Sequence, residues 1–443
     1  MTKKRVLVYP CGTEIALEIH KALRYAKGYE LIGGVDNYDH GRFVYRNIIE
    51  GLPFIKDDSE PDEIIAFERK IAGHGIDFIY PAMDGVIAVF AKYRDLFKKE
   101  NGRDGGNGET LIISNAAEIC RSKRETYRRL QGIVPTPILY DTQCVAEIDS
   151  FPVFVKPDKG QGSVGARKIN TPVELSGVDF TRNIIMEFLP GKEYTVDCFT
   201  NGEGRLIYAR GRGRKRIKDG ISVNAVFEDK PEFQEFAEKI NGAIKQKGGW
   251  FFQLKEDSSG QLRLLEVAAR IAGASAISRN IGANLPLMTL DVFNGVEIED
   301  VALNDYDIEL DRALKNVYKI KDLAYSHVYI DYDDTIVLQD GKINLAVVMF
   351  LYQCINKGVK ITLLSKHEAG KADLEQELKK HRISAIFDEV IHISRQEQKC
   401  KYISRNNGGV IFIDDSYGER KAVKDALDIP VFDTHMIECL LED

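Results

Sequence analysis

The sequence predicts a soluble chain of α/β and α+β architecture, arranged as three successive units. The first sign is an alternation of short apolar runs, at residues 5–9, 30–35 and 77–81, with segments of helical spacing. The second is a change of character near residue 116, where a basic helix and a glycine-rich loop follow. The third is a new series of apolar runs from about residue 325. Strands that alternate with helices are typical of parallel sheets.

Length and composition limit the class of protein. A chain of 443 residues has room for about two to four domains of roughly 100–200 residues each. Its 44% apolar and 29% charged residues are typical of folded soluble proteins. No apolar run approaches the ~18 residues of a membrane span, and the N-terminal run is too short for a signal peptide. We therefore expect a cytoplasmic protein with no membrane partner.

The net charge limits the classes of partner that the protein is expected to bind, and the cysteine pattern indicates the state of its thiols. The net charge of −7 disfavours nucleic acid as a partner of the whole molecule. The seven cysteines are scattered without a CxxC pair, which indicates reduced thiols rather than disulfides. Small molecules are therefore the expected partners, and a homo-oligomer remains open.

The first predicted unit covers residues 1–115. Its strands would pair as a parallel sheet, and residues 101–109, rich in glycine and asparagine, are expected to form a surface loop. Gly12 follows the first strand, where a dinucleotide-binding protein has the first of several glycines. The full GxGxxG motif is absent, so we favour a structural turn over a nucleotide site.

The second predicted unit, residues 116–310, carries a glycine-rich loop directly after a strand. The strand ends at Lys156, and the loop contains Gly160, Gly162 and Ser163. Glycines let backbone N–H groups approach phosphate oxygens, and a lysine neutralises the phosphate charge. This pattern predicts a phosphate-binding loop.

Two oxygen ligands are expected beside this loop. Gln253 and Glu266 lie on successive predicted strands, and antiparallel pairing of those strands would bring the two side chains together. Oxygen ligands of this kind hold Mg²⁺. The unit is therefore expected to bind a nucleotide together with a metal.

These motifs resemble the ATP-grasp superfamily, in particular the carboxylate–amine ligases similar to carbamoyl phosphate synthetase. The resemblance covers about residues 1–310 and rests on KPxxGxGSxG, MEFLPGKEYTVD and the ending EVAARIAG. It implies a Rossmann-like pre-ATP-grasp domain followed by an ATP-grasp domain with a lid at about residues 122–187. It further implies that ATP phosphates contact Lys123, Lys156 and the loop, that Glu187, Phe188 and Leu189 form the adenine hinge, that Glu193 holds the ribose, that Gln253 and Glu266 bind Mg²⁺, and that Arg270 steadies the transferring phosphate.

Ala268 departs from the family pattern. The family usually has asparagine two residues after the metal-binding glutamate, and here one oxygen ligand is lost. A second metal would then be bound weakly or completed by water. This departure supports one alternative, a nucleotide-binding scaffold or regulatory protein with a degenerate catalytic site.

A cationic run, Arg210–Lys218, carries six cations in nine residues. A solvated loop and a substrate-binding loop are both open, and nucleic acid is disfavoured because aromatic residues are not interleaved. Arg210 and Arg212 are the candidate substrate contacts, and such a loop would suit a strongly anionic substrate. Further candidates for the acceptor side are Ser278, Asn280 and Asn284.

The third predicted unit, residues 324–443, begins with a strand that ends in two aspartates. Asp331 and Asp333 are two residues apart, so they can face one pocket as nucleophile and general acid–base. Phosphoryl transfer to a carboxylate also needs a metal, and hydroxyl and ammonium groups on the phosphate oxygens. Later segments supply these groups at strand ends or at a helix start: Ser365, Lys399, Asp414 and Asp415.

These four motifs resemble the haloacid-dehalogenase superfamily of phosphatases. The short interval between Asp331 and Ser365 leaves little room for a cap, so a small uncapped Rossmann-like domain is expected. The resemblance implies that Asp331 is the nucleophile, that Asp333 is the acid–base and a metal ligand through its carbonyl, that Ser365 and Lys399 hold phosphate, and that Asp331 with Asp414 or Asp415 binds Mg²⁺. Lys401 is a rival of Lys399. His367 follows Ser365 closely enough to reach the phosphatase pocket, but a structural role is favoured for it.

Together the motifs predict a bifunctional enzyme that uses ATP and Mg²⁺. One half would form an amide from a carboxylate and an amine through an acyl phosphate. The other half would hydrolyse a small phosphorylated metabolite, and the two halves would share an intermediate if the cationic run binds phosphate. A third alternative keeps the ATP-dependent chemistry without amide formation.

Overall fold

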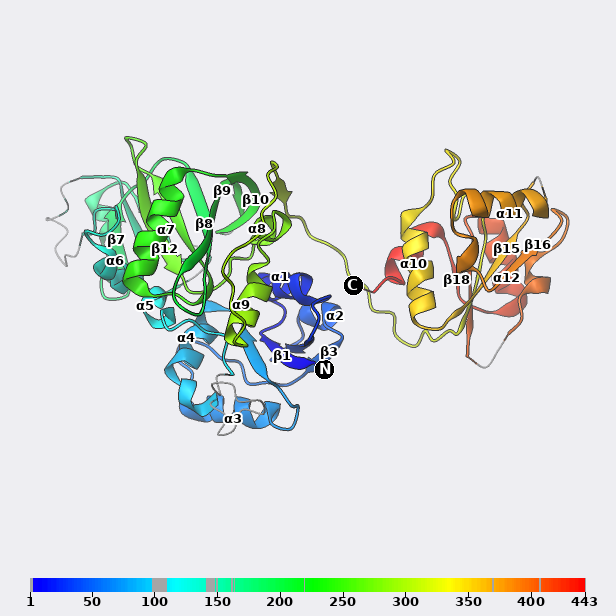
Figure 1. The fold of residues 1–443 in the computed structure, drawn as a ribbon, viewed down its shortest axis with the longest axis horizontal. Helices are drawn as coiled ribbons and strands as arrows, with labels where there is room; N and C mark the ends of the chain where they lie inside the picture. The colour runs from blue at the N-terminus through cyan, green and yellow to red at the C-terminus, as the bar shows by residue number, and fades with distance from the viewer. Residues whose placement is uncertain are drawn as a thin grey trace. The chain divides into compact units, whose positions relative to one another are not determined.

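The structure, a computed structural model, divides into two compact units, residues 1–314 and 315–443 (Figure 1). We refer to them as the N-terminal and C-terminal units and describe each by itself. The described residues are 3–97, 110–140, 148, 150–160, 162, 164–218, 220–368, 370–405 and 408–442. In the described part of the chain, no helix is long and apolar enough to cross a membrane.

The N-terminal unit begins with a four-stranded parallel sheet in the order β3-β2-β1-β4. The parallel pairing predicted from the apolar runs is confirmed. Val6 and Val8 face one core with α1, whereas Leu7 and Tyr9 face a second core with α3 and α4. The elements are β1 (Lys4–Tyr9), α1 (Glu14–Leu23), β2 (Tyr29–Gly34), α2 (Gly41–Val44), β3 (Asn47–Ile49), α3 (Pro61–Ile71), β4 (Phe78–Pro81) and α4 (Asp84–Lys92).

The turn after β1 is filled by a side chain of the protein itself. A Cβ added to Gly12 would lie 2.2 Å from the Asp39 carboxylate, so this carboxylate covers the turn. Thr13 then caps α1, because its hydroxyl accepts the Ala16 N–H at 3.1 Å. This geometry agrees with a structural turn.

A second, antiparallel part follows. It contains a three-stranded sheet, β6-β5-β7, and a six-stranded sheet, β12-β11-β8-β9-β10-β13. Helix α7 packs on the larger sheet around Phe233, Trp250 and Phe252. The elements are α5 (Ala117–Arg121), α6 (Lys123–Leu130), β5 (Val153–Pro157), β6 (Arg167–Ile169), β7 (Asn183–Glu187), β8 (Glu193–Thr200), β9 (Leu206–Lys218), β10 (Ile221–Glu228), α7 (Pro231–Ile244), β11 (Gly248–Glu256), β12 (Leu262–Ala268), α8 (Ala276–Asn280), α9 (Leu285–Phe293) and β13 (Glu309–Asp311).

The cationic run Arg210–Lys218 is not a loop. It forms most of strand β9, which pairs with β8 on one side and β10 on the other. The expectation of a loop is wrong because glycines occupy alternate positions where the chain is crowded. A Cβ at Gly211 would lie 2.2 Å from the Phe233 ring, and one at Gly213 would lie 2.3 Å from Glu228.

The C-terminal unit is a five-stranded parallel sheet in the order β16-β15-β14-β17-β18. Val328 and Ile330 face one core with α10, whereas Tyr329 faces the other with Val423 of α12. The elements are β14 (His327–Ile330), α10 (Leu345–Asn356), β15 (Lys360–Ser365), α11 (Lys371–Lys380), β16 (Glu389–His392), β17 (Val410–Ile413), α12 (Tyr417–Leu427) and β18 (Val431–Phe432).

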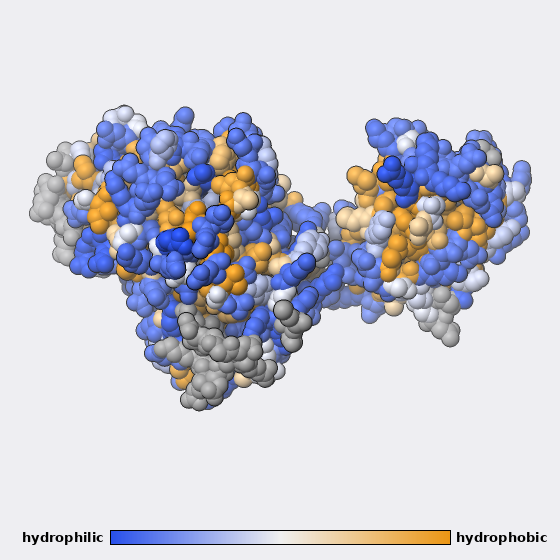
Figure 2. All heavy atoms as spheres, viewed as in Figure 1, coloured by the Kyte–Doolittle hydropathy of each residue, from blue (hydrophilic) through white to orange (hydrophobic). Residues whose placement is uncertain are grey.

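Helix α10 is apolar on two faces. Its buried side packs into the core, and its other side exposes Leu345, Met349 and Tyr352. The spacing of these residues places them in one stripe along the helix. Figure 2 shows apolar residues gathered over the part of this unit where α10 lies.

Candidate functional site

Most of the residues predicted to bind a nucleotide line one cavity of the N-terminal unit. The cavity has a volume of about 160 Å³ and lies between the three-stranded sheet and strands β8, β11 and β12. Glu187 is not among the lining residues, and Ser163 lies outside the described residues. The predicted residues that line it are Lys123, Lys156, Gly160, Gly162, Phe188, Leu189, Glu193, Gln253 and Glu266.

Lys156 is the buried cation of this cavity. Its ammonium group donates to the Tyr127 hydroxyl at 3.2 Å and to the Leu265 carbonyl at 2.9 Å. Both acceptors are uncharged. Burial lowers the pKa of Lys156 to about 7, although the nearby Glu266 carboxylate acts in the opposite direction. An anion in the cavity would therefore find a lysine without a bonded counter-charge.

Lys123 supplies a second ammonium group. It is the first residue of α6, which Ser122 caps, and it donates to the Gly160 carbonyl at 3.3 Å. Since Gly160 belongs to the glycine-rich loop, Lys123 joins the loop to the helix.

Glu187, predicted at the adenine hinge, and Glu193, predicted at the ribose, have different partners. Glu187 does not line the cavity, and its carboxylate accepts the Ile138 N–H at 3.1 Å. Glu193 remains in the cavity wall, where Arg214 and Lys255 pair with it.

Gln253 and Glu266 face each other across the β11–β12 pair, as predicted. Of the described residues, these two are the oxygen-bearing side chains at the predicted metal position, since Ala268 offers none. Two protein ligands fit Mg²⁺, which is commonly bound through one or two carboxylates together with substrate phosphates.

Arg270 lies in a second cavity, of about 280 Å³. It forms two hydrogen bonds to Asp84, at 2.5 and 2.6 Å, and the cation overcomes the effect of burial to lower the pKa of Asp84. Asp84 is the first residue of α4, which follows strand β4 of the parallel sheet, whereas Arg270 follows strand β12 of the antiparallel part. The pair therefore joins the parallel and the antiparallel parts of the N-terminal unit. Arg270 Nη1 also donates to the Ile271 carbonyl at 3.0 Å, so three of the five guanidinium N–H groups have acceptors within the protein. The two cavities share Lys123, Gly160, Gly162, Arg214, Gly220, Gln253 and Glu266.

The arginines of β9 all have carboxylate partners. Arg210 lies 3.3 Å from Asp229, Arg216 lies 2.7 Å from Asp311, and the buried Arg212 pairs with Asp197. Arg212 lines the second cavity and Arg210 does not. Their contact with a substrate stays a prediction.

The other acceptor-side candidates make structural contacts. Ser278 donates to Asp197 at 2.8 Å, Asn280 donates to the Ala276 carbonyl, and Asn284 caps α9. None of these three residues lines the second cavity, and their contact with a substrate stays a prediction.

Comparison with known proteins gives the family context. A family profile described as "ATP-grasp in the biosynthetic pathway with Ter operon" matches residues 179–314. The structure resembles the biotin carboxylase of Campylobacter jejuni, with a TM-score of 0.53 and 16% identity over 68% of this chain and 74% of that one. It also resembles N5-carboxyaminoimidazole synthetase of Staphylococcus aureus, with 0.53 and 15% over 68% and 82%. The chain contains an ATP-grasp domain.

A ligase is also among the similar folds. The L-amino acid ligase of Bacillus licheniformis matches with a TM-score of 0.51 and 17% identity over 67% of this chain and 75% of that one. No curated protein matches the sequence. The family match ends at residue 314, the last residue of the N-terminal unit.

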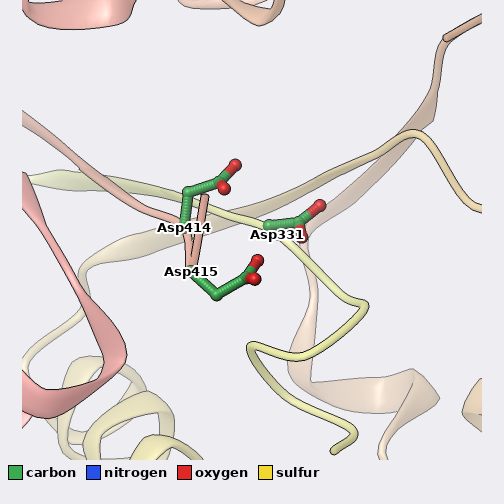
Figure 3. A group of neighbouring side chains, drawn as sticks. All are labelled: Asp331, Asp414 and Asp415. Atoms are coloured by element: carbon green, nitrogen blue, oxygen red, sulfur yellow. The ribbon is translucent and has the colours of Figure 1, made fainter. Parts of the chain in front are cut away.

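Outside the ATP-grasp domain, carboxylates gather at one edge of the C-terminal sheet. Asp331 follows β14, and Asp414 and Asp415 follow the neighbouring strand β17. One oxygen from each of these residues lies within 4.8 Å of the others, and Figure 3 shows the three side chains extending from adjacent strand ends. Their oxygens fit Mg²⁺. Asp333, by contrast, is not in this group.

Lys399 lies between two of these carboxylates. Its ammonium group is 2.6 Å from Asp331 and 2.6 Å from Asp414, and all three side chains are buried. Burial raises the pKa of Asp331 to about 7; Lys399 counteracts this, and Asp414 adds to it. Lys401 is exposed, so the geometry favours Lys399 as the phosphate-binding lysine.

The second aspartate has a different partner. Asp333 accepts hydrogen bonds from His367 Nδ1, at 2.9 and 3.1 Å, and His367 Nε2 lies 2.9 Å from Asp373. Burial lowers the pKa of His367, but its hydrogen bonds to Asp373 and Asp333 outweigh burial and raise it. The Ser365 hydroxyl accepts the His367 N–H at 3.0 Å. His367 therefore contacts both Ser365 and Asp333 of the predicted site, the less favoured of the two interpretations of this histidine from the sequence.

Proposed function

We propose that the ATP-grasp domain is an ADP-forming ligase that joins a carboxylate to an amine and uses ATP and Mg²⁺. The observation that carries this proposal is the wall shared by the two cavities. One cavity has the predicted nucleotide residues, and the other has Arg270. Because Gln253 and Glu266 belong to both, the γ-phosphate and an acceptor can meet there.

The residues have distinct roles in this proposal. Lys123 and Lys156 bind phosphate oxygens, and Gln253 and Glu266 would hold Mg²⁺, which neutralises phosphate charge when bound. A carboxylate oxygen of the substrate attacks the γ-phosphorus of ATP, the bond to ADP breaks, and an acyl phosphate results. The amine nitrogen then attacks the carbonyl carbon, the carbon–oxygen bond to phosphate breaks, and the nitrogen gives up a proton as phosphate leaves. Arg270 stabilises the charge that develops on the transferring group.

Relatives of similar fold support nucleotide binding without fixing the reaction. The biotin carboxylase domain of the Hydrogenobacter thermophilus 2-oxoglutarate carboxylase was solved with MgADP, and the Staphylococcus aureus synthetase was solved with ADP. Names of both ligases and carboxylases occur among the matches. A phosphorylated or carboxylated product without amide formation is therefore the alternative.

The deciding experiment measures ADP formation by the wild-type protein and by a variant of the buried Lys156. The protein is incubated with ATP, Mg²⁺ and a panel of carboxylates and amines, and ADP and new masses are measured. Lys156→Ala is expected to abolish ADP formation, whereas Lys239→Ala, which changes an exposed lysine of α7, leaves it unchanged. If no panel member yields ADP, the scaffold alternative suggested by Ala268 is favoured.

A second function is proposed for the C-terminal unit, namely Mg²⁺-dependent hydrolysis of phosphomonoesters. The Asp331–Lys399–Asp414 arrangement supports it, because it places a nucleophile, a phosphate-binding cation and metal ligands at one strand edge. Ser365 would hold a phosphate oxygen, and Asp333 would act as general acid and base.

The test uses synthetic phosphoesters. Wild-type protein is expected to hydrolyse p-nitrophenyl phosphate when Mg²⁺ is present, and Asp331→Asn removes this activity because an amide is a poor nucleophile. ATP-induced stabilisation of the N-terminal unit should persist in the same variant. Absence of Mg²⁺-dependent hydrolysis in wild type would overturn the phosphatase assignment.

A further inference from the structure

His367 is restrained from several sides at the edge of the C-terminal sheet. Its backbone N–H donates to Ser365, and its carbonyl accepts a hydrogen bond from His392 Nε2 at 2.9 Å. Asp373, in the first turn of α11, holds ring atom Nε2 at 2.9 Å. The Tyr332 ring stands perpendicular to the imidazole, with 5.5 Å between the centroids. These contacts fix both the place and the orientation of the ring.

The other ring nitrogen of His367, Nδ1, faces the Asp333 carboxylate. It lies 2.9 and 3.1 Å from the two carboxylate oxygens. The Asp333 side chain is 51% exposed, whereas that of His367 is only 14% exposed. An aspartate in a surface loop that is open to solvent has several rotamers available, so a rigid neighbour is needed to select one of them.

We propose that His367, anchored by Asp373, is a positioning residue that orients Asp333 for proton transfer to the leaving oxygen, and that the site is therefore built for phosphomonoesters of alcohols. This inference rests on the proposed phosphatase function. It adds to that function a residue pair and a substrate class.

The path of the proton through the two steps explains why phosphomonoesters of alcohols are the expected substrates. In the first step an Asp331 oxygen bonds to phosphorus, the phosphorus–oxygen bond to the leaving group breaks, and the proton of Asp333 passes to the leaving oxygen. In the second step water attacks phosphorus, its proton passes to Asp333, and the bond to Asp331 breaks. An alkoxide is strongly basic and leaves only with a proton, whereas p-nitrophenolate leaves without one.

A comparison of substrates with different leaving groups distinguishes a role of His367 in orienting the general acid from a purely structural role. For His367→Ala, kcat/KM for ethyl phosphate should fall by about a hundredfold, the scale of general acid catalysis. The fall for p-nitrophenyl phosphate should be at least about tenfold smaller, because kcat/KM reports only steps through formation of the aspartyl phosphate. The kcat for p-nitrophenyl phosphate also falls, since the second step needs Asp333 as base for every substrate.

Three companion variants sharpen the test. His367→Asn keeps an amide donor near the position of Nδ1 and should recover part of the ethyl phosphate activity. Asp373→Asn should show the same leaving-group pattern more weakly. His381→Ala is the matched control. His381 directly follows α11, its side chain is mostly buried, and its ring lies 3.3 Å from the Glu377 carboxylate, so both kcat/KM values should stay at the wild-type level.

The outcomes are distinguishable. Equal losses for the two substrates in His367→Ala, while calorimetry shows the C-terminal unit still folded, would overturn the positioning role and leave the phosphatase function standing. Unchanged kinetics for both substrates would also overturn it. If wild type hydrolyses neither substrate, the phosphatase function itself falls, and the inference falls with it.

Discussion

The proposed nucleotide cavity of the N-terminal unit, of about 160 Å³, and the strand edge of the C-terminal unit each bury a lysine, in opposite electrostatic situations. Lys156 donates to a hydroxyl and a carbonyl, and burial lowers its pKa to about 7. Lys399 lies between two carboxylates, which outweigh burial and raise its pKa. The first lysine has no bonded counter-charge, and the second already has two.

This difference teaches what each site must receive from its ligand. The nucleotide cavity needs an anion to stabilise its cation, which ATP phosphates would supply. The strand edge carries surplus negative charge around one lysine, which a divalent cation would balance. Trp250, the only tryptophan of the sequence, lies in β11 of the N-terminal unit, so its fluorescence follows that unit alone, while calorimetry follows both.

The largest expected effect is the loss of the Lys399 ammonium group. Lys399→Met leaves Asp331 and Asp414 buried without their cation, and breaking a buried pair typically costs about 3–5 kcal/mol. Calorimetry should show this loss in the C-terminal unit, with the Trp250 transition unchanged. Lys360→Met, which removes an exposed pair with Glu389, should cost less than about 1 kcal/mol. Equal losses in the two variants would contradict the comparison.

Magnesium without nucleotide should act on one unit. The C-terminal unit has three carboxylate oxygens within 4.8 Å, whereas the part of the ATP-grasp domain that the structure describes offers Gln253 and Glu266 at the predicted metal position. At a hundredfold excess over Kd, binding stabilises a folded state by about 3 kcal/mol. We expect Mg²⁺ to raise the calorimetric Tm of the C-terminal unit and to leave the Trp250 transition in place. Asp415→Asn should remove most of this shift.

Lys156→Met should have a small effect of opposite sign to that of Lys399→Met. The substitution removes a buried charge without breaking an ion pair, so the free energy of unfolding should stay within about 1 kcal/mol of wild type and not fall. Trp250 fluorescence during urea unfolding measures it. Stabilisation by Mg-ATP should vanish in the same variant. A destabilisation of several kcal/mol would show that Lys156 stabilises the folded state on its own.

The smallest expected effect is the uptake of a fraction of a proton when Mg-ATP binds. At pH 8, above the Lys156 pKa of about 7, the free protein carries this lysine mostly neutral. Phosphates beside it raise the pKa again, so binding of Mg-ATP should take up a fraction of a proton. Titration calorimetry in two buffers of different ionisation enthalpy measures this uptake, which should disappear in Lys156→Met. Proton release would have the wrong sign for this assignment.

Much of the fold follows from local patterns. Short apolar runs predicted the parallel strands, and the residues at their carboxyl ends, such as Asp331 and Asp414, lie together because neighbouring parallel strands end at one edge. The pairing of Gln253 with Glu266 followed in the same way from two successive strands. Strand β9 escaped prediction because its charges suggested solvent, while its alternate glycines carried the signal of a crowded strand.

Contacts that do not follow from strand order, such as Asp84 with Arg270 and His367 with Asp333, could not be predicted. Asp84 and Arg270 are 186 residues apart, and His367 and Asp333 are 34 apart, so no spacing rule connects them. A weaker signal existed for Asp84, which follows β4 closely and so stands at the carboxyl edge of a parallel sheet. The pairing itself depends on how the two sheets pack.

The shared wall between the two cavities bears on inhibitor design. A compound that joins an adenosine phosphate to an acyl group could occupy both chambers at once, since Gln253 and Glu266 border each of them. Joining the two parts makes the second contact intramolecular, so its affinity gains from a high effective concentration. A linked compound of this type should bind more tightly than either fragment, and the length of its linker would measure the separation between the nucleotide and the acceptor.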